Sequence, residues 1–202
     1  TASGAVDMMA HIMERYFTNT PDVALTDRLC EALLKTVLDA APKAIANPND
    51  YAARADLAWA GMLAHNNSCG VGREQDWASH QIEHELSAFY DCAHGAGLAI
   101  VFPAWMKYAL AHGGEAKLAQ FAVRVFDVLI SGDDAADAAE GIRRPEAFYR
   151  SLGLTTTLTE NGIGDTDFGR MAERAGAMAG GTLGQFGPLK AADCEAIYRL
   201  AL

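Results

Sequence analysis

The chain has 202 residues, half of them apolar, and a formal net charge of −10. This is enough apolar sequence to bury the core of one compact unit. The negative charge, without a cluster of Lys or Arg, argues against nucleic acid or an anionic membrane surface as a partner. No apolar run reaches the ~20 residues that span a bilayer, and no signal-peptide pattern opens the chain, so we expect a cytoplasmic protein.

The first predicted helix carries two candidate metal ligands. The stretch GAVDMMAHIMERYF places Asp7 and His11 four residues apart, so both project from one helical face. A carboxylate and an imidazole at this spacing can share a metal ion, although a single such pair is more often a surface or hydrogen-bonded feature. Further ligands must come from elsewhere in the chain if this pair is to form a metal site.

Two more helices are predicted next. Residues 22–45 carry apolar residues at helical spacing, and residues 50–68 form an Ala-rich helix that fades into a polar loop. On this second helix we expect Trp59 and Met62 in the core. His65, at the edge of the loop, is expected to be solvated.

Residues 76–105, DWASHQIEHELSAFYDCAHGAGLAIVFPAW, hold three of the six histidines. His80 and His84 are four residues apart and share a helical face. His94 follows His80 by fourteen residues, which on one unbroken helix would separate them by ~21 Å. A zinc–nitrogen bond is only ~2.0–2.1 Å long, so a metal shared by His80 and His94 requires the helix to end between them.

The residues around His94 suit such a break. Asp91, Gly95 and Gly97 are of types that favour turns. The apolar run that follows predicts a buried helix kinked by Pro103, with a short buried strand over residues 98–102 as the alternative.

The rest of the chain predicts helices with short connections. Residues 115–130 are amphipathic, and Asp133 and Asp134 suit the start of the following helix. Two closing helices are predicted over residues 166–181 and 189–202. There is no internal repeat, no G-x-G-x-x-G after a strand and no alternation of strands with helices, so the predicted fold class is all-α, an irregular helical bundle.

Three segments together resemble a known family, the iron-containing (group III) alcohol dehydrogenases, in particular their NAD(P)H-dependent butanol dehydrogenase branch. These segments are TASGAVDMMAHIMERYFT, DWASHQIEHELSAFYDCAHGAGLAIVFPAWMKY and GGTLGQFGPLKAADCEAIYRLAL. The resemblance runs through nearly the whole chain. It implies that residues 1–202 are the C-terminal, dehydroquinate synthase-like helical metal-binding domain of a longer enzyme. It also implies an N-terminal α/β dinucleotide-binding domain that is absent from this chain.

The resemblance also implies the roles of the candidate site residues. In that family an Asp, the His four residues later and two His fourteen residues apart bind one divalent ion, and these positions fall on Asp7, His11, His80 and His94. From the sequence alone, either His80 or His84 could be the ligand on this helix. The resemblance places His84 near the ion and the nicotinamide, in a catalytic role as proton relay or positioning residue. The ligand types fit Fe²⁺ and Zn²⁺ equally.

The function that the resemblance implies is hydride transfer between NAD(P)H and a short-chain aldehyde or primary alcohol, with the ion polarising the substrate oxygen. NAD(P) would be bound mainly by the N-terminal domain, so residues 1–202 alone are expected to be inactive. The implied partner is the small-molecule substrate, and the full-length enzyme is expected to be a homo-oligomer. Two alternatives remain: a helical metal-dependent hydrolase or metal-carrying bundle in which the same ligands activate water, and an interaction bundle without an ion.

Overall fold

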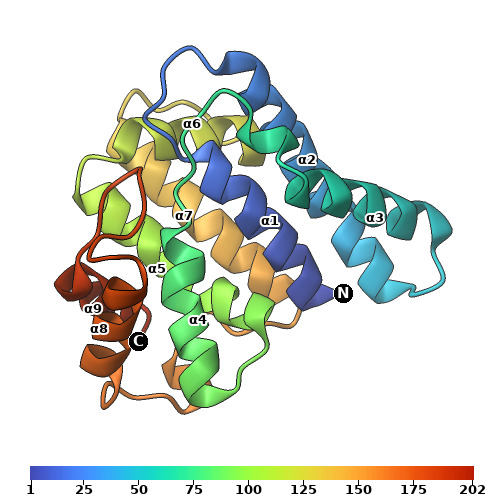
Figure 1. The fold of residues 1–202 in the computed structure, drawn as a ribbon. Helices are drawn as coiled ribbons and strands as arrows, with labels where there is room; N and C mark the ends of the chain where they lie inside the picture. Colours follow the sequence, from blue (N-terminus) through green and yellow to red (C-terminus); the bar gives the residue numbers. More distant parts are fainter.

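The computed structural model describes residues 1–202 as an all-α bundle, which confirms the predicted fold class (Figure 1). Its helices are α1 (Ala2–Tyr16), α2 (Ala24–Ala46), α3 (Tyr51–His65), α4 (Ala78–Tyr90), α5 (His94–Ala111), α6 (Glu115–Phe126), α7 (Asp134–Ser151), α8 (Phe168–Met178) and α9 (Ala191–Leu200). Two short 3-10 turns, η1 (Ser68–Gly70) and η2 (Thr159–Asn161), lie in loops, and there is no β-strand. None of the helices combines the length and apolar character needed to cross a membrane.

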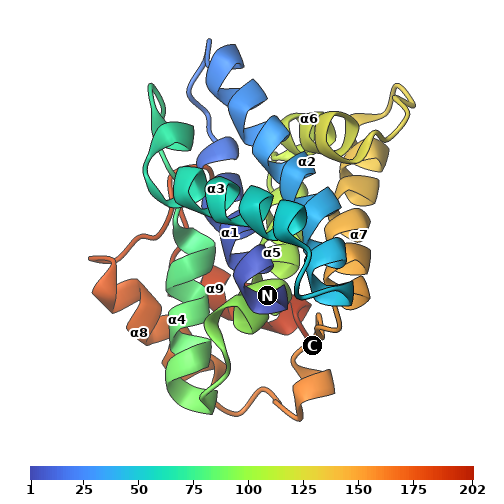
Figure 2. The same cartoon turned by 90° about the vertical axis from the view of Figure 1, so that its right-hand side faces the viewer.

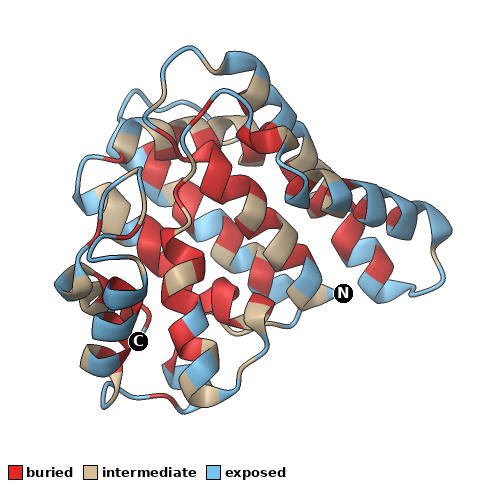
Figure 3. Ribbon diagram, viewed as in Figure 1, coloured by how far each residue is buried: buried red, intermediate tan, exposed pale blue.

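Helices α1 and α5 form the centre of the bundle, where buried residues concentrate (Figure 3). Helix α5 is apolar on all sides, and every residue from Leu98 to Met106 is buried. Helix α1 packs against α2, α3, α4 and α5, and its Met9 and Ile12 are fully buried. A helix that is covered on all sides must be apolar all round, and this is what the sequence supplies.

The predicted break between His80 and His94 exists. Helix α4 ends at Tyr90, the left-handed backbone of Asp91 (φ 51°) turns the chain, and α5 begins at His94. A polar Asp tolerates this conformation better than most residues with a side chain. The chain therefore turns back within three residues, and the two histidines are brought onto adjacent helices.

Gly95 and Gly97 lie within the first turn of α5, not in the break, so the prediction of their role was wrong. A Cβ on Gly95 would lie 2.0 Å from the carbonyl oxygen of Ser3, and one on Gly97 would lie 2.2 Å from Oε1 of Glu83. The two glycines therefore allow α5 to approach α1 and α4 closely. The alternative of a strand over residues 98–102 was also wrong, because α5 runs through this segment.

Helix α3 lies over α1 at the edge of the bundle (Figure 2). Its buried residues are Ala53, Leu57, Ala60 and Ala64. Trp59 and Met62 were predicted to lie in the core, but they are 65% and 42% exposed. The small face of α3 is the one that packs, because it permits a close approach to the neighbouring helices.

The loop between α8 and α9 is tied to the start of α4 by one buried carboxylate. Asp76 Oδ2 accepts hydrogen bonds from the backbone N–H groups of Gln185 and Phe186, and its Oδ1 accepts one from Ala78. Asp76 also donates its own backbone N–H to the carbonyl oxygen of Glu14. These contacts fix the first turn of α4, which carries His80, against α1.

Candidate metal centre

Helices α1, α4 and α5 bring Asp7, His80 and His94 together. The Nε2 atoms of His94 and His80 lie 3.4 Å and 3.7 Å from Oδ1 of Asp7. One ligand atom from each of these residues lies within 4.8 Å of the other two. Residues far apart in the sequence therefore converge on one carboxylate.

His11 approaches the same carboxylate from its own helix. Its Nε2 is 3.7 Å from Oδ1 of Asp7, and its ring centroid is 4.6 Å from that of His80. The helical spacing of Asp7 and His11 produces this contact, as expected from the sequence. The three histidines predicted as metal ligands thus surround one oxygen atom of the fourth predicted ligand, Asp7.

Several polar atoms at this point have no hydrogen-bond partner. Asp7 Oδ1 and His80 Nε2 are both buried and unpaired. Leaving a buried polar atom unpaired costs on the order of 1–3 kcal/mol, and more if it is charged, so such atoms are rare without a reason. A divalent cation between them would satisfy both, and a carboxylate with imidazoles is a donor set that Fe²⁺ and Zn²⁺ accept. The residues present fit a metal ion.

The electrostatics of the cluster centre on Asp7. Burial raises the pKa of Asp7, but His80, His11 and the neighbouring imidazoles outweigh burial and lower this pKa to about 2. Burial lowers the pKa of His80, but Asp7 and Glu14 outweigh it and raise that pKa to about 9. Burial, with His80 and His65, lowers the pKa of His11 to about 4. Asp7 is therefore a carboxylate at neutral pH, and the His11 imidazole is neutral.

Two buried glutamates contact Nδ1 of His80 and His94, the ring nitrogens that do not face Asp7. Glu14 Oε1 lies 3.1 Å from Nδ1 of His80, and Glu83 Oε2 contacts Nδ1 of His94. Glu14 is 1% exposed and Glu83 is fully buried. A histidine that binds a metal almost always donates its other ring N–H to such an acceptor, which fixes the tautomer and the ring orientation. Both Nε2 atoms are left facing Asp7.

Neither glutamate was predicted from the sequence as a site residue. Glu14 follows His11 by three residues and Glu83 follows His80 by three residues, so each lies beside a candidate ligand on the same helix. An acidic residue three positions after a candidate ligand, within a largely apolar stretch, is the pattern that could have indicated a role in the site. However, each glutamate contacts a histidine of another helix. Glu14 of α1 contacts His80 of α4, and Glu83 of α4 contacts His94 of α5.

His65 was predicted to be solvated, and it is exposed, but it also contacts the cluster. It ends α3, its Nε2 lies 3.2 Å from Oδ2 of Asp7, and its ring centroid is 4.1 Å from that of His11. Its side chain remains 43% exposed. Asp7, His11 and His65 form a second set whose ligand atoms lie within 4.8 Å of one another. The position of α3 over α1 explains the contact, and no pattern in the sequence predicted this packing.

His84 lies on the outer side of the cluster. It is exposed, and its ring centroid is 5.3 Å from that of His94 and 6.3 Å from that of His80. Partial burial, together with His94 and His80, lowers the pKa of His84. The structure therefore places it beside the cluster, with no contact to Asp7.

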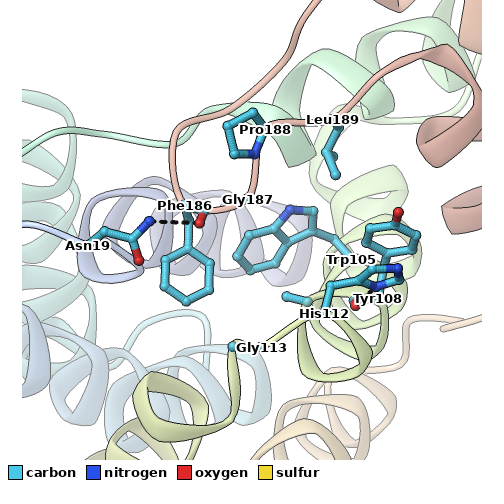
Figure 4. Close-up of a pocket in the computed structure, with 11 residues that line it drawn as sticks. Asn19, Trp105, Tyr108, His112, Gly113, Phe186, Gly187, Pro188 and Leu189 are labelled. Atoms are coloured by element: carbon cyan, nitrogen blue, oxygen red, sulfur yellow. Dashed lines mark hydrogen bonds between the residues drawn. The ribbon is translucent and has the colours of Figure 1, made fainter.

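A separate pocket of about 260 Å³ lies between the C-terminal half of α5 and the loop that precedes α9 (Figure 4). Trp105, Tyr108 and Phe186 line it, and Asn19 donates a hydrogen bond to the carbonyl oxygen of Phe186. On α5, Tyr108 lies about 21 Å along the helix axis from His94. This pocket is not part of the metal centre.

The fold and the converging ligands define a helical domain with a candidate metal centre. The sequence model described as "Fe-containing alcohol dehydrogenase family, C-terminal" matches residues 1–202. The chain belongs to this family, which confirms the assignment made from the sequence.

Related proteins and solved structures agree with this assignment. The chain is 42% identical over 203 residues to the probable NADH-dependent butanol dehydrogenase 1 of Bacillus subtilis, covering 100% of the chain and 52% of the relative. It superposes on the aldehyde reductase YqhD of E. coli with a TM-score of 0.94 and 32% identity, covering 100% of this chain and 52% of that one. For the NADH-dependent butanol dehydrogenase A of Thermotoga maritima, the TM-score is 0.91 and the identity 35%, with 100% and 52% covered. The chain spans about half the length of the relatives that it matches.

Proposed function

We propose that this chain is the metal-binding half of an alcohol dehydrogenase that transfers a hydride between NAD(P)H and a short-chain aldehyde or primary alcohol. Asp7, His11, His80 and His94 would hold one divalent ion, Fe²⁺ or Zn²⁺. The observation that carries the proposal is the buried, unpaired Oδ1 of Asp7, which three imidazole Nε2 atoms surround at 3.4–3.7 Å.

The names of two relatives support the reaction and the use of NADH or NADPH as the hydride donor. The Bacillus subtilis relative is described as an NADH-dependent butanol dehydrogenase, and the E. coli relative as an NADPH-dependent aldehyde reductase. The dinucleotide would be bound mainly by a part of the protein outside residues 1–202.

The bound ion would act as a Lewis acid that stabilises negative charge on the substrate oxygen. Asp7 would supply the one ionised ligand, and Glu14 and Glu83 hold His80 and His94 so that their Nε2 atoms face the site. The buried carboxylates and close helix packing keep these groups in place before substrate arrives. Such preorganisation is what electrostatic stabilisation of a developing charge requires.

We assign His84 a role in proton transfer or substrate positioning. It is exposed beside His94, so a proton can pass between its ring and solvent. Burial and the neighbouring imidazoles lower its pKa, which leaves the ring neutral and able to accept a proton at neutral pH.

The ligand assignment is tested by metal analysis of the 202-residue chain after iron or zinc loading and dialysis. The His80→Ala/His94→Ala double variant is expected to retain only trace metal, and His112→Ala, a histidine outside the cluster, should match the wild type. Equal metal content in the double variant would overturn the assignment. In the full-length enzyme, loss of NAD(P)H oxidation with butanal in the same double variant tests the reaction, whereas ester hydrolysis without NAD(P)H would favour a metal-dependent hydrolase.

A further inference from the structure

The end of α3 is anchored to α1 beside the metal centre. The Arg15 guanidinium donates hydrogen bonds to the carbonyl oxygens of His11 and Ala64. On the preceding turn of α3, a Cβ on Gly61 would lie 3.1 Å from the terminal methyl group of Met8, so the helices are in close contact there. His65 follows Ala64 directly. Its position next to Asp7 is therefore fixed by the packing of two helices.

The hydrogen bonding of His65 determines what its second nitrogen can do. Nδ1 lies 2.7 Å from the carbonyl oxygen of Gly61, which can only accept, so Nδ1 carries the proton. In the neutral ring Nε2 then has a lone pair, and this lone pair lies 3.2 Å from Oδ2 of Asp7. Two lone pairs that face one another repel. A cation bound to both atoms turns this repulsion into attraction.

The same arrangement occurs at two of the residues proposed as ligands. His80 and His94 each have Nδ1 against an oxygen acceptor and Nε2 facing Asp7. This is the orientation expected of a metal-binding histidine. His65 shares it, with a backbone carbonyl as the acceptor, whereas Nδ1 of His11 is buried without a partner. By this criterion His65 belongs with His80 and His94.

We propose that His65 is a further ligand of the ion, binding through Nε2 on the Oδ2 side of Asp7. This inference rests on the proposed function, because the ion is the one placed there. The protein ligands would then be the Asp7 carboxylate and four imidazoles. Zinc sites in proteins typically have three or four protein ligands, so a fifth protein ligand favours iron(II) in this chain.

The competing role for His65 is that of a residue that does not coordinate the ion. In that role a protonated ring would donate a hydrogen bond to Asp7. Both roles predict weaker ion binding when His65 is replaced. Only the ligand role changes the number of imidazoles bound to the ion, and this number is the measurement that separates them.

The test uses the 202-residue chain loaded with cobalt(II), an air-stable substitute for iron(II). Proton NMR counts the bound imidazoles through their strongly shifted, exchangeable ring N–H signals, and titration gives the affinity. His65→Gln is compared with His112→Gln. His112 is a matched control because its Nδ1 also lies 2.7 Å from the carbonyl oxygen four residues earlier, and it belongs to none of the clusters of metal-binding side chains. Circular dichroism and thermal unfolding establish that each variant is folded, and His65→Ala serves as a second variant.

We expect the His65 variants to lose one bound imidazole and at least ~10-fold in cobalt affinity, since even outer residues contribute 10–100-fold. The His112 variant should keep the wild-type count and affinity. A folded His65→Gln chain with the wild-type number of bound imidazoles would overturn the inference, whatever its affinity, and would leave the proposed function intact. A wild-type chain that binds no cobalt would instead overturn the proposed metal centre, and this inference with it.

Discussion

Glu14 and His80 are joined through a single carboxylate oxygen. Glu14 Oε1 accepts a hydrogen bond from the backbone N–H of His80 at 3.0 Å and lies 3.1 Å from its Nδ1. Glu14 belongs to α1 and His80 to α4, so this one oxygen sets both the first turn of α4 and the orientation of the imidazole. The glutamate is 1% exposed, and solvent does not compete for these contacts.

Replacing Glu14 with Gln should weaken metal binding without removing a ligand. The amide keeps the shape of the side chain but loses the charge that orients His80 and increases its basicity. We expect the affinity for iron(II), zinc or cobalt(II) to fall by 10–100-fold, a typical magnitude of ~1.4–2.7 kcal/mol. Titration calorimetry checks this result. Glu140→Gln, which alters an exposed ion pair on α7, is the control, and equal affinity in both variants would contradict the prediction.

Gly97→Ala should disturb the metal centre indirectly, by displacing Glu83. The new Cβ would lie 2.2 Å from Oε1 of Glu83, so Glu83 must move and its contact with His94 must change. We expect weaker ion binding and a loss of about 1–3 kcal/mol in the free energy of unfolding. Denaturant unfolding and metal titration measure the two effects.

The control for Gly97→Ala is Gly4→Ala in α1, where an added Cβ meets nothing within 4 Å. Alanine is the better helix former, so this variant should gain up to ~1 kcal/mol and bind the ion normally. If Gly97→Ala behaves like Gly4→Ala, the close contact between α4 and α5 at Gly97 does not control the site.

Asp7→Asn should abolish tight metal binding, because it removes the only ionised group that the three imidazoles surround. Metal content after dialysis is expected to fall from stoichiometric to trace. Asp39→Asn changes an exposed carboxylate paired with Lys43 and should retain the metal. Retention of stoichiometric metal by the Asp7 variant would show that the carboxylate is not a ligand.

Metal affinity should rise with pH across the neutral range. In the metal-free chain Asp7 and Glu14 outweigh burial and raise the pKa of His80 to about 9, so this ring is protonated at pH 7. A ligand histidine must be neutral, and binding therefore releases this proton. Because His80 must lose its proton, the apparent affinity should increase about tenfold per pH unit below the pKa of His80 and level off above about pH 9. The pKa of His11 is lowered to about 4, so His11 contributes no such dependence near neutrality.

Cobalt titrations at several pH values, in two buffers of different ionisation enthalpy, measure both the affinity and the protons released. An affinity that stays constant between about pH 6.5 and pH 8.5 would contradict the assignment of His80 as a ligand.

Much of the fold follows from local sequence. Asp133 was expected near a helix start, and it caps α7 by accepting hydrogen bonds from the backbone N–H groups of Ala135 and Ala136. A chain reversal before His94 was expected if His80 and His94 share an ion, with Asp91 as a residue that suits it, and the structure places the reversal at Asp91. These features depend on neighbours in the chain, which is why the sequence suffices to predict them.

The parts that could not be predicted depend on which faces pack together. Helix α3 has apolar residues on several sides, so periodicity predicts a helix but does not say that Ala60 faces inward and Trp59 outward. The same uncertainty hid the contact between His65 and Asp7, which exists only because α3 lies over α1. Glu83 is near His94 for a comparable reason, since Gly97 allows their helices to come together.

Asp7 and His94 stand far apart along the chain, and in the folded protein their ligand atoms are 3.4 Å apart. An ion held by both would act as a reversible cross-link, and the unfolded chain has no comparable site. At a free concentration one hundred times the dissociation constant, such an ion stabilises the folded state by about 2.7 kcal/mol. The resistance of the folded chain to unfolding, and hence to proteolysis of the unfolded state, would thereby depend on the supply of the ion.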